Sequence, residues 1–190
     1  MLYSLASILS FSIFKCFFEI KIKGKDSLPR KGPFIIAANH VSNLDPFVVG
    51  SCAFPIKVSF LAKEELFYNK FSSFIFKDLG AIPLKRGSVD IGALKAGLKS
   101  LQKRPLVIFP QGSRSENFDK FSVGVGFLCK KTNVPVIAAR IYGTEKSLSK
   151  TQKHFCVCPI TIIFSKVDNI DENDDYEAIT LKVKNKIKSL

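Results

Sequence analysis

The feature that most constrains the fold of this 190-residue chain is the alternation of apolar, strand-like runs with segments of helical periodicity. The strand-like runs are short and almost continuously apolar, and they span 34–38, 56–62, 106–109, 134–138 and 155–167. Behind a possible cap at Asp90, four apolar residues recur at helical spacing: Ile91, Leu94, Leu98 and Leu101. Strands that are apolar at every position are buried on both faces. The pattern therefore predicts a single α/β domain with a mixed, mostly parallel sheet flanked by helices.

The C-terminal segment is compatible with two secondary structures. Its apolar residues at 179, 181, 183 and 187 alternate with lysines, as in a half-buried strand. The apolar residues at 179, 183, 187 and 190 also line one face of a helix, and the acidic residues that precede them favour a helix start. The sequence leaves both open.

The N-terminal segment 1–18, MLYSLASILSFSIFKCFF, is apolar and carries one charge, Lys15. On a helical wheel Ser4, Ser7 and Lys15 lie on one side, and the run is slightly short for a spanning helix. We interpret it as a membrane-associated helix that lies in one leaflet or at its interface, followed by the main domain at 19–190. An ordinary core helix and a short spanning helix are the alternatives.

The charge of the chain points to an anionic partner. Lys and Arg number 29 against 16 Asp and Glu, which gives a formal net charge of +13. Such a field attracts nucleic acid, an anionic membrane or a phosphorylated substrate, although a merely soluble basic surface would look the same. The apolar N-terminus favours membrane lipids over nucleic acid, so we expect no nucleic-acid partner.

The five cysteines form no C-x-x-C pair. This pattern indicates reduced, mostly buried thiols in the cytosol rather than a disulfide framework or a zinc site, and no other metal motif is present. Together with the N-terminal helix, it leads us to expect a membrane-associated protein on the cytoplasmic face of the inner or plasma membrane.

The segment NHVSNLDP, residues 39–46, carries the candidate catalytic pair, His40 and Asp45. His40 follows a predicted strand, and Asp45-Pro46 has the composition of a helix start with Asp at the cap. The intervening loop can fold the two side chains together, so that Asp45 both caps the helix and accepts a hydrogen bond from Nδ1 of His40. Nε2 is then a base for an incoming hydroxyl, as in a Ser-His-Asp triad whose serine is replaced by the substrate alcohol.

A second polar segment, FPQGSR at 109–114, follows the predicted strand 106–109. It lies at the carboxyl end of the strand, where open α/β sheets bind ligands. Gly112 lets the backbone approach an anion, Ser113 offers a hydroxyl, and Arg114 can bind a phosphate through two hydrogen bonds. Lys63 and Arg86 follow other strand-like or apolar runs and are further basic candidates.

Several motifs resemble those of the 1-acyl-sn-glycerol-3-phosphate acyltransferases, a family of the glycerolipid acyltransferase superfamily. NHVSNLD is similar to the family's H-x4-D motif, GAIPLKR to its second motif, FPQGSRS to its third and NVPVIAA to its fourth. LAKEELF resembles the A-K-x-E-L segment. The four motifs occur in the family's order between Asn39 and Ala139.

The resemblance implies acyl transfer from a thioester to the sn-2 hydroxyl of lysophosphatidate, which makes phosphatidate for phospholipid biosynthesis. His40 would be the general base and Asp45 its orienting partner, while Arg114, Lys63 and Arg86 would hold the acceptor's phosphate. The donor would be acyl-CoA or the acyl carrier protein thioester, with no further cofactor and no metal.

Two positions depart from the family pattern. Gln111 stands where the family usually has Glu, and Ala138 where it often has Pro. A different acceptor, such as glycerol 3-phosphate or another lyso-lipid, would share much of the same pattern. A catalytically silent, basic membrane-binding protein is the alternative from another class.

Overall fold

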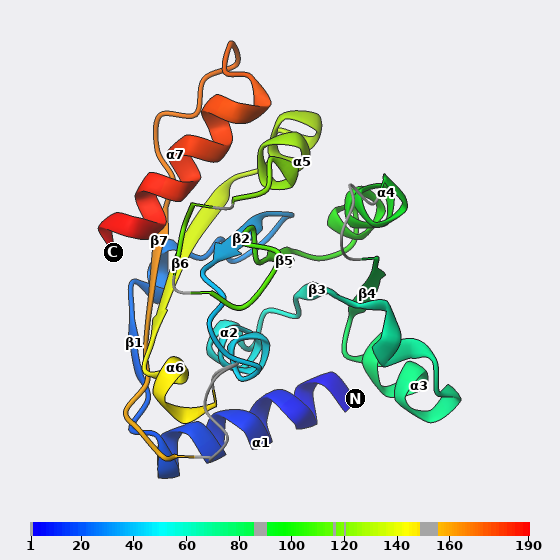
Figure 1. Ribbon diagram of the computed structural model, residues 1–190, viewed down its shortest axis with the longest axis vertical. Coiled ribbons are helices and arrows are strands. Elements are labelled where there is room, and N and C mark those ends of the chain that lie inside the picture. The colour runs from blue at the N-terminus through cyan, green and yellow to red at the C-terminus, as the bar shows by residue number, and fades with distance from the viewer. Residues whose placement is uncertain (1, 86–90, 116, 120, 149–155) are drawn as a thin grey trace.

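A seven-stranded sheet forms the middle layer of the computed structural model, which describes residues 2–85, 91–115, 117–119, 121–148 and 156–190. The strand order is β1-β7-β6-β2-β5-β3-β4 (Figure 1). The strands are β1 (Lys21–Lys23), β2 (Ile35–Ala38), β3 (Ser59–Lys63), β4 (Ala81–Leu84), β5 (Leu106–Ile108), β6 (Val136–Tyr142) and β7 (Thr161–Lys166). Only the β6–β7 pairing is antiparallel among these strands. The predicted mixed, mostly parallel sheet is confirmed.

Helices cover both faces of this sheet (Figure 1). Helices α1 and α2 pack on one face, and α4, α5 and α7 on the other. The helices are α1 (Leu2–Phe17), α2 (Asp45–Ala53), α3 (Lys70–Asp78), α4 (Ile91–Leu101), α5 (Gly124–Thr132), α6 (Thr144–Ser147) and α7 (Tyr176–Ser189), with short 3-10 turns η1 (Lys25–Ser27) and η2 (Glu64–Phe67). The fold is a single α/β domain in three layers.

The central strand β2 shows why the apolar runs become buried strands. It lies between β6 and β5, and all four of its residues are buried. Ile36 and Ala38 face the α1–α2 core, whereas Ile35 and Ala37 face the α4–α5–α7 core. Burying one isoleucine side chain stabilises a fold by about 1.5–3 kcal/mol, and here each side of the strand has a helical layer to pack against. The carboxyl end of β2 is thereby fixed, and it leads directly into His40.

Two strands differ from the sequence prediction because they lie at the sheet's edges. β1 has the sequence KIK, and β4 contains Pro83, which lacks a backbone donor. Edge strands tolerate both features because one side is unpaired, so these segments lack the continuous apolar pattern. β7 is shorter than the predicted run 155–167, whose first residue lies outside the described part of the chain.

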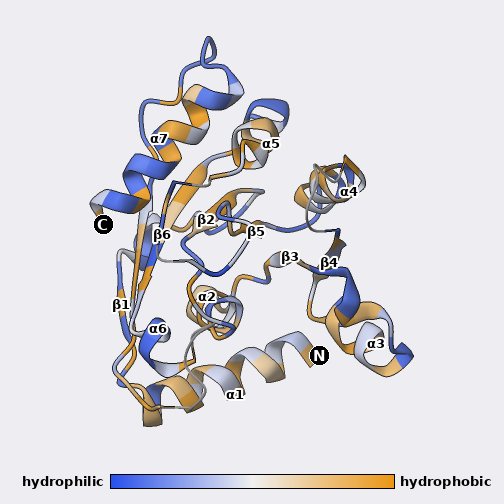
Figure 2. Ribbon diagram, viewed as in Figure 1, coloured by the Kyte–Doolittle hydropathy of each residue, from blue (hydrophilic) through white to orange (hydrophobic). Residues whose placement is uncertain are grey.

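The C-terminal segment, for which the sequence left strand and helix open, is the helix α7. Asp175 caps it, accepting a hydrogen bond from the backbone N–H of Ala178 at 2.7 Å. Its apolar face, which includes Ile179, Val183 and Ile187, packs into the core with α5. In Figure 2 this helix alternates between orange and blue, as expected of a helix with one buried face.

The N-terminal segment forms α1, and its two faces have opposite roles. Tyr3, Ser7 and Phe14 are buried against the domain. The opposite face carries a stripe of large apolar residues exposed to solvent, namely Leu2, Leu5, Ile8, Leu9, Ile13 and Phe17. Within the ranges that the structure describes, no helix is both long and apolar enough to cross a membrane. A contiguous exposed apolar stripe of this kind marks an interaction surface.

The cysteines are less buried than the sequence analysis predicts. Cys52 and Cys129 are buried, but Cys16 and Cys156 are exposed and Cys158 is half-buried. The prediction of mostly buried thiols is wrong because Cys16 lies on the outer side of α1 and Cys156 in the segment before β7.

Candidate active site

The candidate catalytic residues lie at the carboxyl edge of the parallel strands. His40 follows β2, the FPQGSR segment follows β5, and Thr144 follows β6. Because β6, β2 and β5 are adjacent and parallel, their carboxyl ends open onto the same edge. The topology brings together three loops that are far apart in the sequence.

His40 and Asp45 form a direct hydrogen bond, with Nδ1 of the imidazole 2.8 Å from Oδ2 of the carboxylate. Asp45 is fully buried and His40 is 8% exposed. With the carboxylate as acceptor, Nδ1 carries the proton and Nε2 presents its lone pair. A base oriented in this way accepts a proton from a hydroxyl group, and the carboxylate stabilises the imidazolium that forms.

Three further donors fix the Asp45 carboxylate. Oδ2 accepts the backbone N–H groups of Val41 and Ser42 at 2.7 and 2.8 Å, and Oδ1 accepts the Thr144 hydroxyl at 2.7 Å. The predicted capping role of Asp45 is wrong. It lies in the first turn of α2, whose N-cap is Leu44, and it binds amides of the loop before the helix. These contacts curl the loop back on itself and bring the carboxylate to the imidazole.

The imidazole is also held from the β5 side. Its ring lies 4.5 Å from the ring of Phe109, centroid to centroid, at an interplanar angle of 31°. The backbone N–H of His40 donates to Oε1 of Gln111 at 2.7 Å, and its carbonyl accepts from the N–H of Ser115 at 2.8 Å. The loop after β5 is therefore attached to the backbone of His40 itself.

Gln111 uses its whole amide in this attachment. Nε2 donates to the carbonyls of Ser115 and Asn117 at 2.6 and 3.0 Å, while Oε1 accepts from His40. The residue is buried, and this orientation matches donors to acceptors at all three contacts. The residue that departs from the family pattern thus joins two loops through backbone groups, a role that the sequence analysis did not anticipate.

The predicted substrate-binding residues of the β5 loop lie beside this attachment. Gly112 has a left-handed backbone with φ of +66°, and nothing lies within 4 Å of the position where a Cβ would stand. Gly112 and Ser113 are exposed, and Arg114 is half-buried. Arg114 makes no ion pair with another described residue. It immediately precedes Ser115, whose N–H contacts the His40 carbonyl, so the loop places a cationic residue next to the histidine.

The other two predicted cationic contacts are further away. Lys63 ends β3, two strands from β2, which corresponds to roughly 10 Å at the usual strand spacing. Its ammonium group forms a half-exposed ion pair with Glu65, Nζ to Oε1, at 2.6 Å. Arg86 lies outside the described residues. The geometry therefore gathers His40, Asp45 and the 112–114 segment, whereas Lys63 already has an acidic partner.

Two residues that hold the site in place, Thr144 and Asn39, have only a weak signal in the sequence. Thr144 follows Gly143 at the end of β6, a polar residue at the ligand-binding edge, yet 99 positions separate it from Asp45. The Asn39 side chain bridges to β6, donating to the Ile141 carbonyl at 2.9 Å and accepting its N–H at 2.7 Å. Within the described ranges, no three His, Cys, Asp or Glu side chains gather as metal ligands would.

Comparisons with known sequences agree with this geometry. The family model described as Acyltransferase matches residues 19–142, more than half of the chain. The 1-acyl-sn-glycerol-3-phosphate acyltransferase of Bacillus subtilis is 25% identical over 174 residues, which cover 90% of this chain and 87% of that protein. The enzyme of the same name from Saccharomyces cerevisiae is 30% identical over 139 residues, or 69% of this chain and 45% of its own length. This chain thus matches less than half of the yeast protein.

A solved structure shows the same fold. The crystal structure of the 1-acyl-sn-glycerophosphate acyltransferase from Thermotoga maritima superposes with a TM-score of 0.79. The match covers 98% of this chain and 77% of the other, at 22% sequence identity. The two proteins therefore share the same fold.

Proposed function

This chain belongs to the acyltransferase family, and we propose that it transfers a fatty acyl group from a thioester to the sn-2 hydroxyl of lysophosphatidate, making phosphatidate. The observation that carries the proposal is the buried His40–Asp45 pair at the carboxyl edge of the sheet, 2.8 Å apart. The names of the relatives from Bacillus subtilis and Saccharomyces cerevisiae support the choice of acceptor.

The proposed reaction needs one base and no covalent enzyme intermediate. Nε2 of His40 removes the proton from the acceptor hydroxyl as its oxygen attacks the thioester carbonyl. The tetrahedral intermediate then collapses, the carbon–sulfur bond breaks, and the imidazolium returns the proton to the leaving sulfur. Asp45 stays ionised throughout and stabilises the imidazolium. The donor is acyl-CoA or acyl carrier protein, since either supplies the thioester.

Arg114 is proposed to bind the acceptor's phosphate. Its guanidinium can make two parallel hydrogen bonds to phosphate oxygens, and Gly112 leaves the loop surface open next to it. Lys63 and Arg86 remain proposed contacts, and Lys63 would have to leave Glu65 to take part. A positive charge on the loop beside His40 would hold the acceptor with its alcohol near Nε2.

Backbone amides of the same loop are proposed donors for the oxyanion. The N–H of Gly112 bonds to the Phe109 carbonyl and that of Ser115 to His40. Ser113 and Arg114 lie between these two residues, and their backbone N–H groups form no hydrogen bond with any residue in the described ranges. Preorganised amides of this kind stabilise the charge that develops on a thioester oxygen.

The exposed stripe of α1 is proposed to lie on a membrane, on its cytoplasmic face, with residues 19–190 forming the catalytic domain. Leu5 and Leu9 are 65% and 60% exposed, and such surface stabilises a helix at the interface of a bilayer. A lipid-bound acceptor would then reach the active site without leaving the membrane surface.

An assay of the purified protein against several acceptors tests the proposed substrate. Lysophosphatidate, glycerol 3-phosphate and lyso-lipids without a terminal phosphate would each be offered with both thioester donors. We expect lysophosphatidate to give the highest kcat/KM, because only a matched site discriminates strongly between acceptors. A higher value for glycerol 3-phosphate or for another lyso-lipid would move the proposal to that acceptor. Absence of turnover with every pair would favour the silent membrane-binding protein.

A further inference from the structure

The opposite edge of the sheet holds a basic pocket that the proposed reaction does not use. It has a volume of about 540 Å³ and is lined by the segments that precede β2, β3 and β5. These three strands are adjacent and parallel, in the order β2-β5-β3. The pocket lies at their amino ends, and His40 lies beyond the carboxyl end of β2. At about 3.3 Å per residue, the two sites are roughly 15–20 Å apart.

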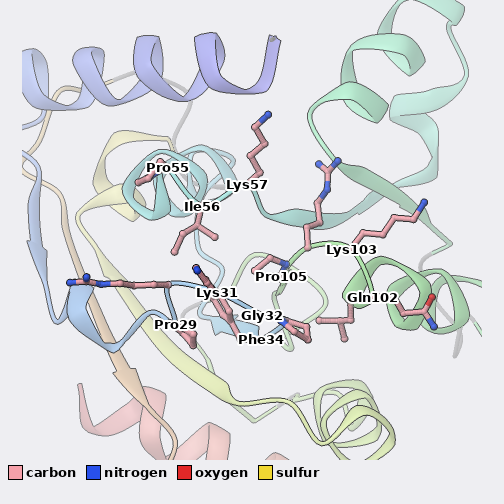
Figure 3. Close-up of a pocket in the computed structure, with 14 residues that line it drawn as sticks. Pro29, Lys31, Gly32, Phe34, Pro55, Ile56, Lys57, Gln102, Lys103 and Pro105 are labelled. Carbon is pink, nitrogen blue, oxygen red and sulfur yellow. The ribbon is translucent and has the colours of Figure 1, made fainter.

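Five cationic side chains from all three segments line this pocket: Arg30, Lys31, Lys57, Lys103 and Arg104. None of the described residues that line it is acidic. None of the five takes part in an ion pair within the described part of the chain. Figure 3 shows the side chain of Lys57 extending toward the ribbon of α1, whereas the side chain of Lys103 extends in a different direction, away from Pro105. A concave site lined by one sign of charge concentrates anions.

The negative carboxyl ends of nearby helices do not neutralise the positive charge of the pocket. α2 ends at Ala53 and α4 at Leu101, so both direct their carboxyl ends toward the pocket segments. Each helix end carries about half a negative charge, which two of the cations more than neutralise. A surplus of several positive charges remains, and their mutual repulsion is relieved only by a bound anion or by solvent.

The shape of the pocket suits a small phosphorylated group. Its volume lies within the roughly 300–1,000 Å³ of ligand sites, and its floor includes the buried side chain of Phe34. The first N–H groups of β2, β3 and β5 are already bonded to backbone carbonyls, so the ligand contacts would come from side chains. Arg104 is half-buried, and its charge lies near Tyr3 of α1, where it opposes the rise in the pKa of Tyr3 that burial causes.

We propose that this pocket is a second anion site, which binds a phosphate-bearing ligand held by Arg30, Lys31, Lys57, Lys103 and Arg104. Two sources have the required chemistry, a soluble polyphosphate and the headgroup of an anionic lipid. The pocket adjoins the first turn of α1, since the Tyr3 hydroxyl accepts the N–H of Val58, the residue after Lys57, at 3.0 Å. A membrane contacted by α1 would therefore also face this site.

A charge-matched pair of double variants tests the site. Lys57→Gln/Lys103→Gln removes two exposed pocket cations, and Lys95→Gln/Lys99→Gln removes two exposed cations of α4 that do not line the pocket. Inorganic pyrophosphate is titrated into each full-length protein by calorimetry. Each protein is also sedimented with vesicles of phosphatidylcholine, with and without phosphatidylglycerol. Thermal melts confirm that both variants fold.

The pocket variant is expected to bind one of the two probes about tenfold or more weakly, because it loses two charge-assisted contacts. The α4 control should change by less than about threefold, since it alters only the general field. A selective loss of pyrophosphate affinity identifies a soluble ligand, and a selective loss of phosphatidylglycerol-dependent binding identifies a lipid headgroup. Equal losses in both variants, or binding of neither probe by the wild type, would overturn the proposal.

Discussion

At the scale of single residues, the candidate site depends on a buried carboxylate whose hydrogen bonds come from two segments, the loop 40–42 and Thr144. Asp45 accepts the imidazole N–H, two loop amides and the hydroxyl of Thr144. An ionised carboxylate with no exposure to water requires this many donors. Each donor therefore has two consequences, since it stabilises the fold and it helps to set the position of the proposed base, His40.

Thr144 is a positioning residue whose effect can be separated from general stability. In Thr144→Val, the Oδ1 atom of Asp45 loses its donor, and the carboxylate can rotate away from His40. We expect kcat to fall about tenfold, with little change in KM for the acceptor, since the loss acts on proton transfer rather than on binding. Thr144→Ser keeps the hydroxyl and should restore most of kcat. If Ser and Val lower kcat equally, the hydroxyl has no such role.

A substitution at Gln111 tests how the loop after β5 is joined to the backbone of His40. In Gln111→Glu, a carboxylate oxygen would face the carbonyls of Ser115 and Asn117, which now accept hydrogen bonds from the amide. We expect the free energy of unfolding at neutral pH to fall by about 1–3 kcal/mol. These acceptors favour the protonated acid and raise its pKa in the folded state, so the deficit should shrink as the pH falls. Denaturation at several pH values measures this, and a deficit that is constant or grows toward acid pH would contradict it.

At the scale of helices and strands, the elements that could be predicted are those buried on both faces, because burial gives their sequences a continuous apolar pattern. β2, β5 and β6 are buried and apolar throughout, or nearly so, and were predicted from sequence. β1, β4 and α3 were not, because none of their residues is buried and their formation depends on neighbours that sequence alone does not show. The sequence also did not show that the apolar stripe of α1 faces solvent, because this depends on which face of the helix packs against the domain.

Cys16 reports on this stripe directly, because it is an exposed thiol on α1. A water-soluble maleimide should label Cys16 quickly in the free protein and at least about tenfold more slowly with lipid vesicles, since a helix at the interface buries its outer face. Cys52 serves as the internal control. It is buried, and burial raises the pKa of its thiol to about 12, so it should stay unlabelled in both cases. Equal labelling of Cys16 with and without vesicles would count against the membrane contact.

At the scale of the whole molecule, the sheet separates two sites of different character. The carboxyl edge carries His40, Asp45 and the 112–114 loop, and the amino edge carries the basic pocket. The first was predictable in outline, because the motif residues follow apolar strands. The partners Thr144 and Gln111 were not, since their contacts cross 99 and 71 positions of sequence and depend on strand order. The pocket was also hidden, because its cations come from three separate loops.

Because of the buried thiol of Cys52, the free energy of unfolding is expected to fall as the pH rises into the alkaline range. Its pKa in the folded protein is about 12, against an ordinary value of 9.0. Above the ordinary value the unfolded chain loses this proton while the folded protein keeps it. The thiol therefore contributes stability below about pH 9 that is lost as the pH rises toward 12. Urea unfolding of wild type and Cys52→Ala between pH 8 and about 10.5 should show a steeper decline in the wild type, by at most about 1.4 kcal/mol per pH unit. Parallel declines would contradict it.

The most direct test of the account is the turnover of acyl transfer in His40→Ala and Asp45→Asn, measured beside vesicle binding of the same proteins. We predict that kcat falls by about 10²–10⁴-fold in both variants, because one lacks the base and the other lacks the carboxylate that orients it. Vesicle binding should be unchanged, since neither residue lies on α1. Turnover close to that of the wild type in the His40→Ala protein would show that this imidazole is not the base.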